Sequence, residues 1–234
     1  MIIRKSAERG KNKIAWLDAN HTFSFGNYRD PKWTNFNNLL VINEDTISPA
    51  MGFGTHPHDN MEIITYIIDG SIKHRDSMGS VGEITPGEIQ IMSAGTGVTH
   101  SEFNGLEDKF THLLQIWVLP NKENIKPRYD QRRVYRTDEI NFLKVIAGID
   151  ETDTHAKLNA DAQIWLGKFN KVSSLEFRPQ YFKNFWIQIV KGEISIGDKT
   201  FSAGDGLAFS HKDSININTT NTDSEFLILE LADY

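Results

Sequence analysis

The chain has no cysteine among its 234 residues. That absence excludes disulfide bonds, thiolate metal sites and cysteine nucleophiles, and it fits a reducing compartment. Long apolar runs are missing as well, since no stretch approaches the roughly 20 apolar residues of a membrane span. The sequence begins Met1-Ile-Ile-Arg-Lys5, which lacks the apolar segment of a secretory signal. We therefore expect a soluble cytoplasmic protein.

Excess positive charge is also lacking. The formal net charge is −6, and no block of like charges suggests a binding tail. This balance argues against a surface that contacts nucleic acid directly. Apolar residues make up 39% of the chain and aromatic residues 11%. The length and this apolar content allow one large packed domain or two smaller ones.

Helical periodicity is scarce, and short strand-like runs replace it. These runs are rich in Ile, Val, Phe, Tyr and Trp and are separated by Gly, Asn, Asp and Pro, which predicts an all-β sandwich or barrel. The clearest runs are Glu62–Ile68, Glu88–Met92, His112–Val118, Phe185–Val190 and Glu225–Leu231. One short helix is predicted near Thr137 to Phe142.

The chain resembles a duplication of one β-unit. The segment Tyr66–Lys73 parallels Ile189–Ser195, because each reads as a strand, a polar turn with glycine and a returning strand. In the same way Ile84–Gln90 parallels Phe201–Leu207. The prolines and charges from Pro120 to Arg136 predict a linker, so we expect a first domain at 1–125 and a second at 126–234.

Paired polar residues in the first half point to a metal. His56 and His58 are separated by one residue, as are His100 and Glu102. Residues i and i+2 of a strand lie on one face, so each pair can aim inward, and two such strands facing each other would bring four ligands together. Nitrogen and oxygen donors without thiolate suit Fe(II), Mn, Ni, Co, Cu or Zn. The second half has no matching His-x-His pair, so we expect it to bind no metal.

The sequence around these residues resembles the cupin family, and within it the pirins. His56-Pro-His58-x3-Glu62 is similar to the first cupin motif, and Gly87-x5-Ser93-Ala-Gly95 followed by His100-x3-Asn104 is similar to the second. The departures from those motifs resemble bacterial pirins, as do the runs Phe53–Ile63, Gln90–Glu102, Leu114–Val118 and His21–Phe25. The resemblance implies a bicupin, two tandem jelly-roll barrels, with one mononuclear metal in the N-terminal barrel, usually iron.

The resemblance also bears on the fourth ligand. Ordinary cupins take the carboxylate from the first motif, which here is Glu62, whereas pirins take it from the second, which here is Glu102. Glu102 is therefore the favoured ligand and Glu62 its rival. His74 and His112 lie outside both pairs, and we expect them to be surface or hydrogen-bonded core residues.

Several bacterial pirins are quercetin 2,3-dioxygenases, so the resemblance implies an enzyme that opens the central ring of a flavonol with O2 and releases CO. In this interpretation Glu102 is also the candidate catalytic base for the 3-hydroxyl. The candidate pocket residues are Phe53, Met92, Phe103 and Trp117. The alternative that pirins suggest is a regulatory, redox-sensing metal protein that acts through protein partners.

Overall fold

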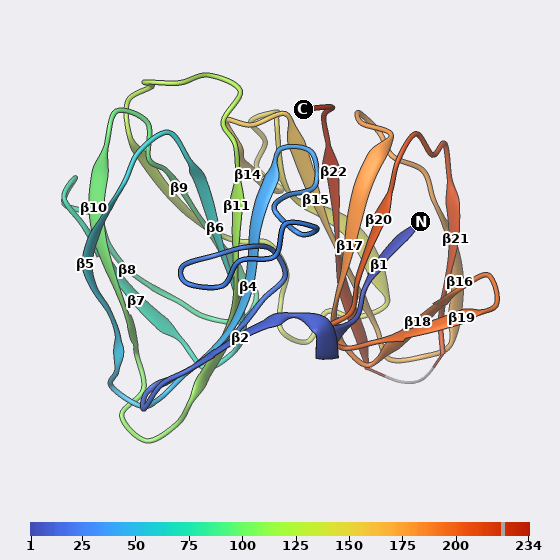
Figure 1. Ribbon diagram of the computed structural model, residues 1–234, viewed down its shortest axis with the longest axis horizontal. Coiled ribbons are helices and arrows are strands. Elements are labelled where there is room, and N and C mark those ends of the chain that lie inside the picture. The colour runs from blue at the N-terminus through green and yellow to red at the C-terminus, as the bar shows by residue number, and fades with distance from the viewer. Residues whose placement is uncertain (221–222) are drawn as a thin grey trace.

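The computed structural model describes residues 1–220 and 223–234, and nearly all of its regular structure is β-strand (Figure 1). The sequence-based prediction of an all-β bicupin is confirmed. Two β-units lie side by side, one formed by the earlier residues and one by the later residues. Each contains a seven-stranded and a four-stranded sheet within the described residues.

The larger sheet of the first unit has the strand order β12-β9-β6-β11-β4-β3-β2, and the smaller sheet has the order β5-β10-β7-β8. The bounds are β2 Gly10–Lys13, β3 Leu17–His21, β4 Leu39–Ile47, β5 Gly52–His58, β6 Glu62–Asp69, β7 Ile72–Asp76, β8 Val81–Ile84, β9 Glu88–Ser93, β10 Val98–Asn104, β11 Thr111–Val118 and β12 Arg128–Arg133. Strands β7 and β10 alternate buried and exposed residues, so each turns one face to the interior.

The second unit repeats this plan with a seven-stranded sheet, β1-β20-β17-β22-β15-β13-β14, and a four-stranded sheet, β16-β21-β18-β19. Its strands are β1 Ile2–Arg4, β13 Phe142–Gly148, β14 Ala156–Lys157, β15 Ala162–Phe169, β16 Ser173–Phe177, β17 Asn184–Lys191, β18 Glu193–Ile196, β19 Lys199–Ser202, β20 Gly206–Phe209, β21 Ile215–Thr219 and β22 Ser224–Leu231. The match between the two plans agrees with the repeat seen in the sequence.

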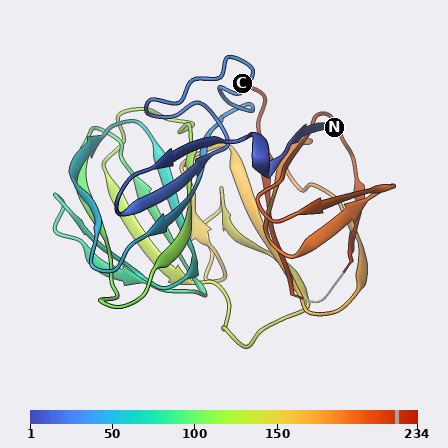
Figure 2. The ribbon, with the colours of Figure 1, turned by 60° about the horizontal axis from the view of Figure 1, so that its bottom comes forward.

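Two strands cross between the halves of the chain. The N-terminal strand β1 pairs with β20 of the second unit, and Figure 2 shows this end of the chain beside the later strands. Strand β12 lies beyond residue 125 but pairs with β9 of the first unit. The segment expected to be a linker therefore contains a strand of the first unit. The domain boundary between residues 125 and 126 stays a proposal. The two pairings assign β1 to the second unit and β12 to the first.

The predicted helix near Thr137 to Phe142 is wrong. Thr137 and Asp138 form a turn, and Phe142 begins β13. Phe142 pairs with Lys168 of β15, so pairing within the sheet outweighs the weak local helical preference. Within the described ranges the helical element is a single 3-10 turn, η1 at Ser6–Glu8.

The two larger sheets share one hydrophobic core. Its buried members include Ile64 and Ile116 from the first unit and Leu227 and Leu229 from the second. A polar contact crosses the same interface, because the buried Tyr66 hydroxyl donates a hydrogen bond to Glu225, which also pairs with Lys168. The units are thus packed against each other by both apolar contact and hydrogen bonding.

We expect Leu229→Ala to lower the free energy of unfolding by about 2 to 5 kcal/mol, because a fully buried side chain would leave a cavity in the shared core. Denaturant unfolding followed by circular dichroism and fluorescence measures this. Val172→Ala, at a side chain that is 72% exposed, is the control and should change little. Two separate transitions with only one shifted would contradict a shared core.

Candidate metal centre

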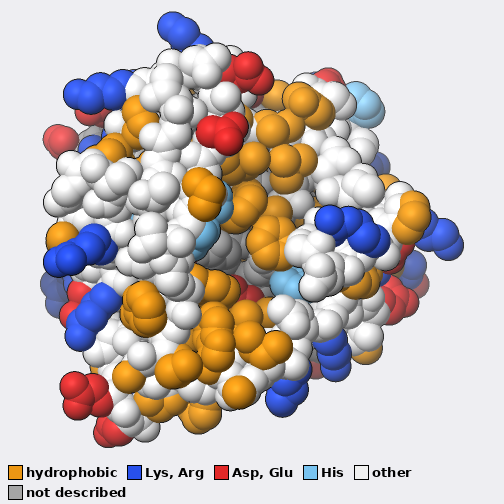
Figure 3. Space-filling view, turned by 60° about the vertical axis from the view of Figure 1, so that its left-hand side comes forward, with side chains coloured by type: hydrophobic (Ala, Val, Ile, Leu, Met, Phe, Trp, Pro, Cys, Tyr) orange, Lys and Arg blue, Asp and Glu red, His pale blue; other side chains and the backbone are white. Residues whose placement is uncertain are grey.

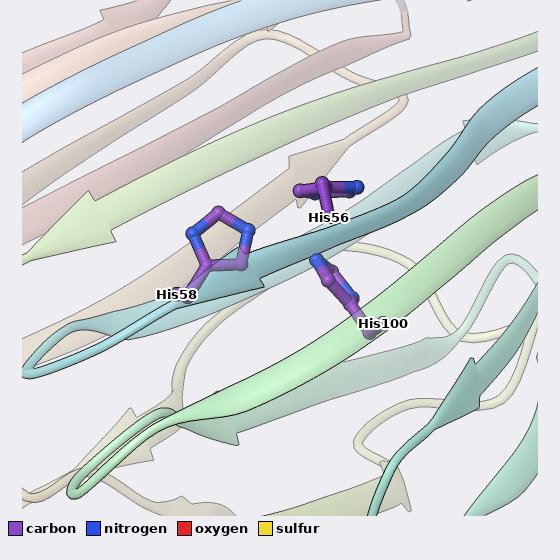
Figure 4. Close-up of side chains that lie close together, drawn as sticks. All are labelled: His56, His58 and His100. Atoms are coloured by element: carbon purple, nitrogen blue, oxygen red, sulfur yellow. The ribbon is translucent and has the colours of Figure 1, made fainter.

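Three imidazoles meet because β5 and β10 pair in a particular register. His100 lies directly opposite His56 across the antiparallel pair, and His58 follows two residues along β5. Figure 4 shows the three rings converging from these two strands. The ring centroids are 4.4 Å apart for His56 and His100, 4.8 Å for His56 and His58, and 4.9 Å for His58 and His100. The expectation that the strands face each other is wrong, since they are hydrogen-bonded neighbours in one sheet.

The pairing of β5 with β10 shifts between His100 and Glu102, which lies opposite Phe53. This bulge turns the backbone so that the Gly54 carbonyl lies 2.8 Å from Nδ1 of His56. A carbonyl only accepts, so Nδ1 of His56 carries the proton and Nε2 keeps its lone pair. Nearby, a Cβ on Gly52 would lie 2.2 Å from the carbonyl oxygen of Glu102, so the close approach of the two strands requires glycine.

The electrostatics of the cluster favour neutral, metal-binding imidazoles. Burial lowers the pKa of His100 to about 2, with further lowering from the neighbouring histidines. Burial, followed by the charge of His56, lowers the pKa of His58 to about 4. Nε2 of His100 is buried and has no hydrogen-bond partner among the described residues. Unprotonated nitrogens that converge and lack partners fit one divalent metal ion.

Glu102 lies close to His100 and His74, but it does not belong to the group of ligand atoms formed by His56, His58 and His100. Its carboxylate and the ring nitrogens of His74 and His100 lie within 4.8 Å of one another, and His56, His58 and His100 form a separate group by the same measure. Glu102 is 2% exposed, and burial raises its pKa to about 7. Gln115 and Thr65 donate hydrogen bonds to its two oxygens. Its closeness to His100 supports Glu102 as the fourth ligand, which stays a proposal.

The rival carboxylate, Glu62, points elsewhere. It accepts hydrogen bonds from Oγ of Ser93 at 3.0 Å and from the backbone N–H of Asn159 at 3.1 Å. Asn159 belongs to the second half of the chain, so Glu62 joins the two units. Burial raises its pKa to about 7, and within the described part of the chain Glu62 is in neither group that could hold a metal.

Two further histidines of the first unit, His74 and His112, differ in surroundings. His74 is 1% exposed and lies between Asp76, at 3.1 Å, and His100, at 3.5 Å. Spacing in the sequence gave no sign of this closeness, because it depends on the pairing of β7 with β10. His112 is partly exposed and pairs with Glu44 at 2.9 Å.

A cavity of about 530 Å³ opens beside His56 and His58. Figure 3 shows a hollow on this face, with histidine side chains inside and hydrophobic side chains around it. The cavity is lined by Lys11, Asn12, Leu17, Ala19, His21, Phe25, Gly26, Asn27, Tyr28, Asn43, Asp45, Phe53, His56, His58, Glu102, Gln115 and Trp117. Its size is typical of small-molecule sites.

Two of the four candidate pocket residues line this cavity, namely Phe53 and Trp117. Met92 does not, because it is fully buried in a small core cluster with Ile63, Ala94 and Val98. Phe103 does not either. It follows Glu102 on β10, so alternation turns it to the outer face, where it is 40% exposed.

Sequence reasoning missed the polar residues of the cavity wall, among them Asn43, Asp45 and Gln115. The inward face of β4 carries Asn43 and Asp45 between apolar neighbours. No clear signal for this lining exists in the sequence, because Asn43, Glu44, Asp45 and Thr46 are consecutive polar residues and do not alternate with apolar ones.

The comparisons with known proteins agree with this geometry. The family model described as Pirin matches residues 3–118, and the one described as Quercetinase C-terminal cupin domain matches residues 145–231. A quercetin 2,3-dioxygenase of Escherichia coli strain K12 is 41% identical over 231 residues, which cover 99% of this chain and 98% of that protein. The chain belongs to the pirin family.

Solved structures extend the comparison to the fold of this pirin. The bacterial pirin YhhW of Escherichia coli, solved in complex with nickel(II), has a TM-score of 0.92 and 39% identity, and the match covers 100% of this chain and 99% of YhhW. A quercetin 2,3-dioxygenase from Acinetobacter baumannii, at 20% identity and a TM-score of 0.78, shares the fold; the match covers 100% of this chain and 86% of that one. Across the described residues of this pirin, no helix is long and apolar enough to cross a membrane.

We expect His56→Ala and His100→Ala each to lose bound metal, because each removes one of three converging nitrogens. The loss in affinity should exceed the about 10- to 100-fold that is typical of removing an outer hydrogen-bond partner. Elemental analysis after loading with Fe(II) or Ni(II) measures it. His211→Ala, at an exposed residue of the second unit, is the matched control and should keep the metal.

The two buried glutamates provide a paired test. Glu102→Gln should weaken metal binding, whereas Glu62→Gln should keep the metal and lower thermal stability, because Glu62 bonds across the units. Metal titration and thermal unfolding of both variants separate these outcomes. Loss of metal in Glu62→Gln together with retention in Glu102→Gln would reverse the assignment.

Proposed function

We propose that this protein is a metal-dependent flavonol 2,3-dioxygenase that opens the central ring of a quercetin-like substrate with O2 and releases CO. One observation carries the proposal: two of the three converging imidazoles, His56 and His58, line a cavity whose wall also contains Phe25, Tyr28, Phe53 and Trp117. The cavity volume lies within the range of about 300 to 1,000 Å³ that is usual for small ligands. The names of the relatives support the same reaction.

We further propose Fe(II) as the metal, held by His56, His58, His100 and Glu102. Three nitrogens and one oxygen suit Fe(II) and equally Mn, Ni, Co, Cu or Zn, so supply decides which metal binds in the cell. When bound, the metal would supply a Lewis acid that stabilises the anion of a substrate hydroxyl, and it would assist the reaction with dioxygen. The protein residues perform the remaining tasks.

Glu102 is the residue proposed to take the proton from the substrate's 3-hydroxyl. Its carboxylate lines the cavity beside the histidines, where a positioned side chain can accept a proton from a bound substrate. Gln115 orients the carboxylate, because its amide N–H donates to Glu102 while its carbonyl accepts the Trp117 indole N–H at 3.2 Å. In the balanced reaction both oxygen atoms of O2 enter the opened product, and one ring carbon leaves as CO.

The aromatic walls would hold the flat substrate and exclude water. Trp117 stands edge-on to Phe25 at 5.3 Å and to His58 at 4.9 Å. Phe53 and Tyr28 extend the apolar surface of the same cavity. Such rings offer large contact areas in a fixed orientation, which suits a planar polyphenol.

Asp45 is proposed as a polar anchor for the substrate. It lines the cavity, is 4% exposed, and has an Oδ1 without a hydrogen-bond partner in the described part of the chain. Burial, followed by the nearby Glu102 charge, raises the pKa of Asp45 to about 7. A hydroxyl of the substrate can donate to the ionised form or accept from the protonated form, so it would satisfy the buried oxygen in either state.

The cavity argues against the alternative function, a redox-sensing regulator that acts through protein partners. A metal centre used only for sensing would not need an aromatic cavity beside its histidines. The geometry therefore supports catalysis.

We expect the Fe(II)-loaded protein to consume the visible absorbance of quercetin only when O2 is present, and to release CO in equal amount. Absorbance spectroscopy with CO trapping measures both. The metal-free His56→Ala variant is the control and should be inactive. Absence of turnover with each of Fe, Mn, Co and Ni would overturn the proposed reaction.

For Asp45→Ala we expect KM for quercetin to rise about tenfold with the metal content unchanged, because a buried hydrogen bond of about 1.4 kcal/mol is lost. Steady-state kinetics on quercetin and on analogues that each lack one hydroxyl identify its partner. The variant should no longer distinguish quercetin from one of these analogues. Equal KM values for variant and wild type would refute the role of Asp45.

A further inference from the structure

A row of polar side chains continues from the metal centre into the interior of the first unit. Strand β7 pairs with β10 on the side opposite β5, so that His100 faces Asp76 and Glu102 faces His74. Residues directly opposite in an antiparallel pair lie on the same face. His74 and Asp76 therefore share the inner face with the proposed ligands, and they are 1% and 8% exposed.

Asp76 is held as a hydrogen-bond acceptor. One of its oxygens accepts the backbone N–H groups of Met78 at 2.9 Å and of Ser80 at 3.0 Å. Its other oxygen lies 3.1 Å from Nε2 of His74. Because a carboxylate only accepts, Nε2 of His74 carries a proton. In neutral His74, Nδ1 is then left with a lone pair.

The contact between His74 and His100 determines which ring nitrogen of His100 carries the hydrogen. Their Nδ1 atoms lie 3.5 Å apart. Two lone pairs facing each other would repel, so the hydrogen between them belongs to Nδ1 of His100, which donates to His74. Nε2 of His100 then keeps a lone pair, and this buried nitrogen has no hydrogen-bond partner among the described residues.

The opposite tautomer of His100 would be costly. It would place an N–H group at the buried Nε2 without a partner, and it would bring two unprotonated Nδ1 atoms together. The ring of His74 is held against rotation by Tyr129 of β12, whose ring centroid lies 4.6 Å away. Packing and hydrogen bonding thus select one orientation.

We propose that Asp76 and His74 are positioning residues that hold His100 in the tautomer whose Nε2 is free to bind a metal. His56 reaches the same state through the Gly54 carbonyl, so two ligands are oriented by different partners. Partners of this kind raise ligand basicity and fix ring orientation in metal sites. The inference rests on the proposed ligand role of His100 but not on the proposed reaction.

Asp76→Asn is the decisive variant. Asparagine can keep the two backbone hydrogen bonds on its carbonyl oxygen and turn its amide N–H toward His74. His74 would then be protonated at Nδ1, and His100 at Nε2, which blocks the metal-binding nitrogen. A carboxylate-to-amide change beside a histidine can leave the fold intact and impose the wrong tautomer.

The test is carried out on the metal-free and the metal-titrated protein, without substrate. Nitrogen-15 NMR of labelled histidine rings should show wild-type His100 protonated at Nδ1 and the Asp76→Asn variant protonated at Nε2. Competition with a chelator should show about 10- to 100-fold weaker Ni(II) binding in the variant. Quercetin turnover is not used, so failure of the proposed reaction would leave this result unaffected.

His74→Phe is a second variant that tests the same inference if Asp76→Asn does not fold. It keeps a ring against Tyr129 but removes both nitrogens, so Ni(II) binding should weaken to a similar degree. Thermal unfolding should show a folded variant of lower stability, because the buried Asp76 oxygen loses its partner. His112→Gln, at a histidine outside the row, should bind Ni(II) like wild type. Wild-type His100 protonated at Nε2, or unchanged Ni(II) affinity in folded Asp76→Asn and His74→Phe, would overturn the inference.

Discussion

The backbone register between β5 and β10 is the constraint on which the centre depends. Pairing of His56 with His100 places two imidazoles side by side, and the two-residue period of β5 adds His58. A shift of one residue would turn one strand's ligands to the outer face. Gly52 permits the close approach of the strands, and the bulge beside it brings the Gly54 carbonyl to His56.

Burial then gives these groups their chemical character. The same removal from water lowers the pKa of His58 and His100 and raises that of Glu102 and Asp45, so the cavity wall favours neutral forms. Neutral imidazoles are the form that binds metals. The buried carboxyl groups of Glu102 and Asp45 line the same cavity as His56 and His58.

The second unit supports the first without a comparable histidine cluster among its described residues. Its large sheet completes the shared core, and Asn159 bonds to Glu62. The carboxylate at the position of the first cupin motif is thereby engaged in joining the units. Glu102 and Gln115 instead lie beside the histidines, which supports the proposal that Glu102 rather than Glu62 is the fourth ligand.

Local pattern was enough to predict the strands and the shared face of His56 and His58, because alternation along a strand is a property of neighbouring residues. The meeting of these two residues with His100 depends on the register between β5 and β10. The helix predicted near Thr137 to Phe142 is absent because sheet pairing outweighed a weak local preference. Only the tertiary structure showed that Phe53, Trp117 and Asp45 line the cavity. It also showed that Met92 lies in the core and that Phe103 lies on the outer face. It also brought His74 and Asp76 to His100. These placements depend on which strands are neighbours and in what register, and contacts between residues far apart in the chain decide both.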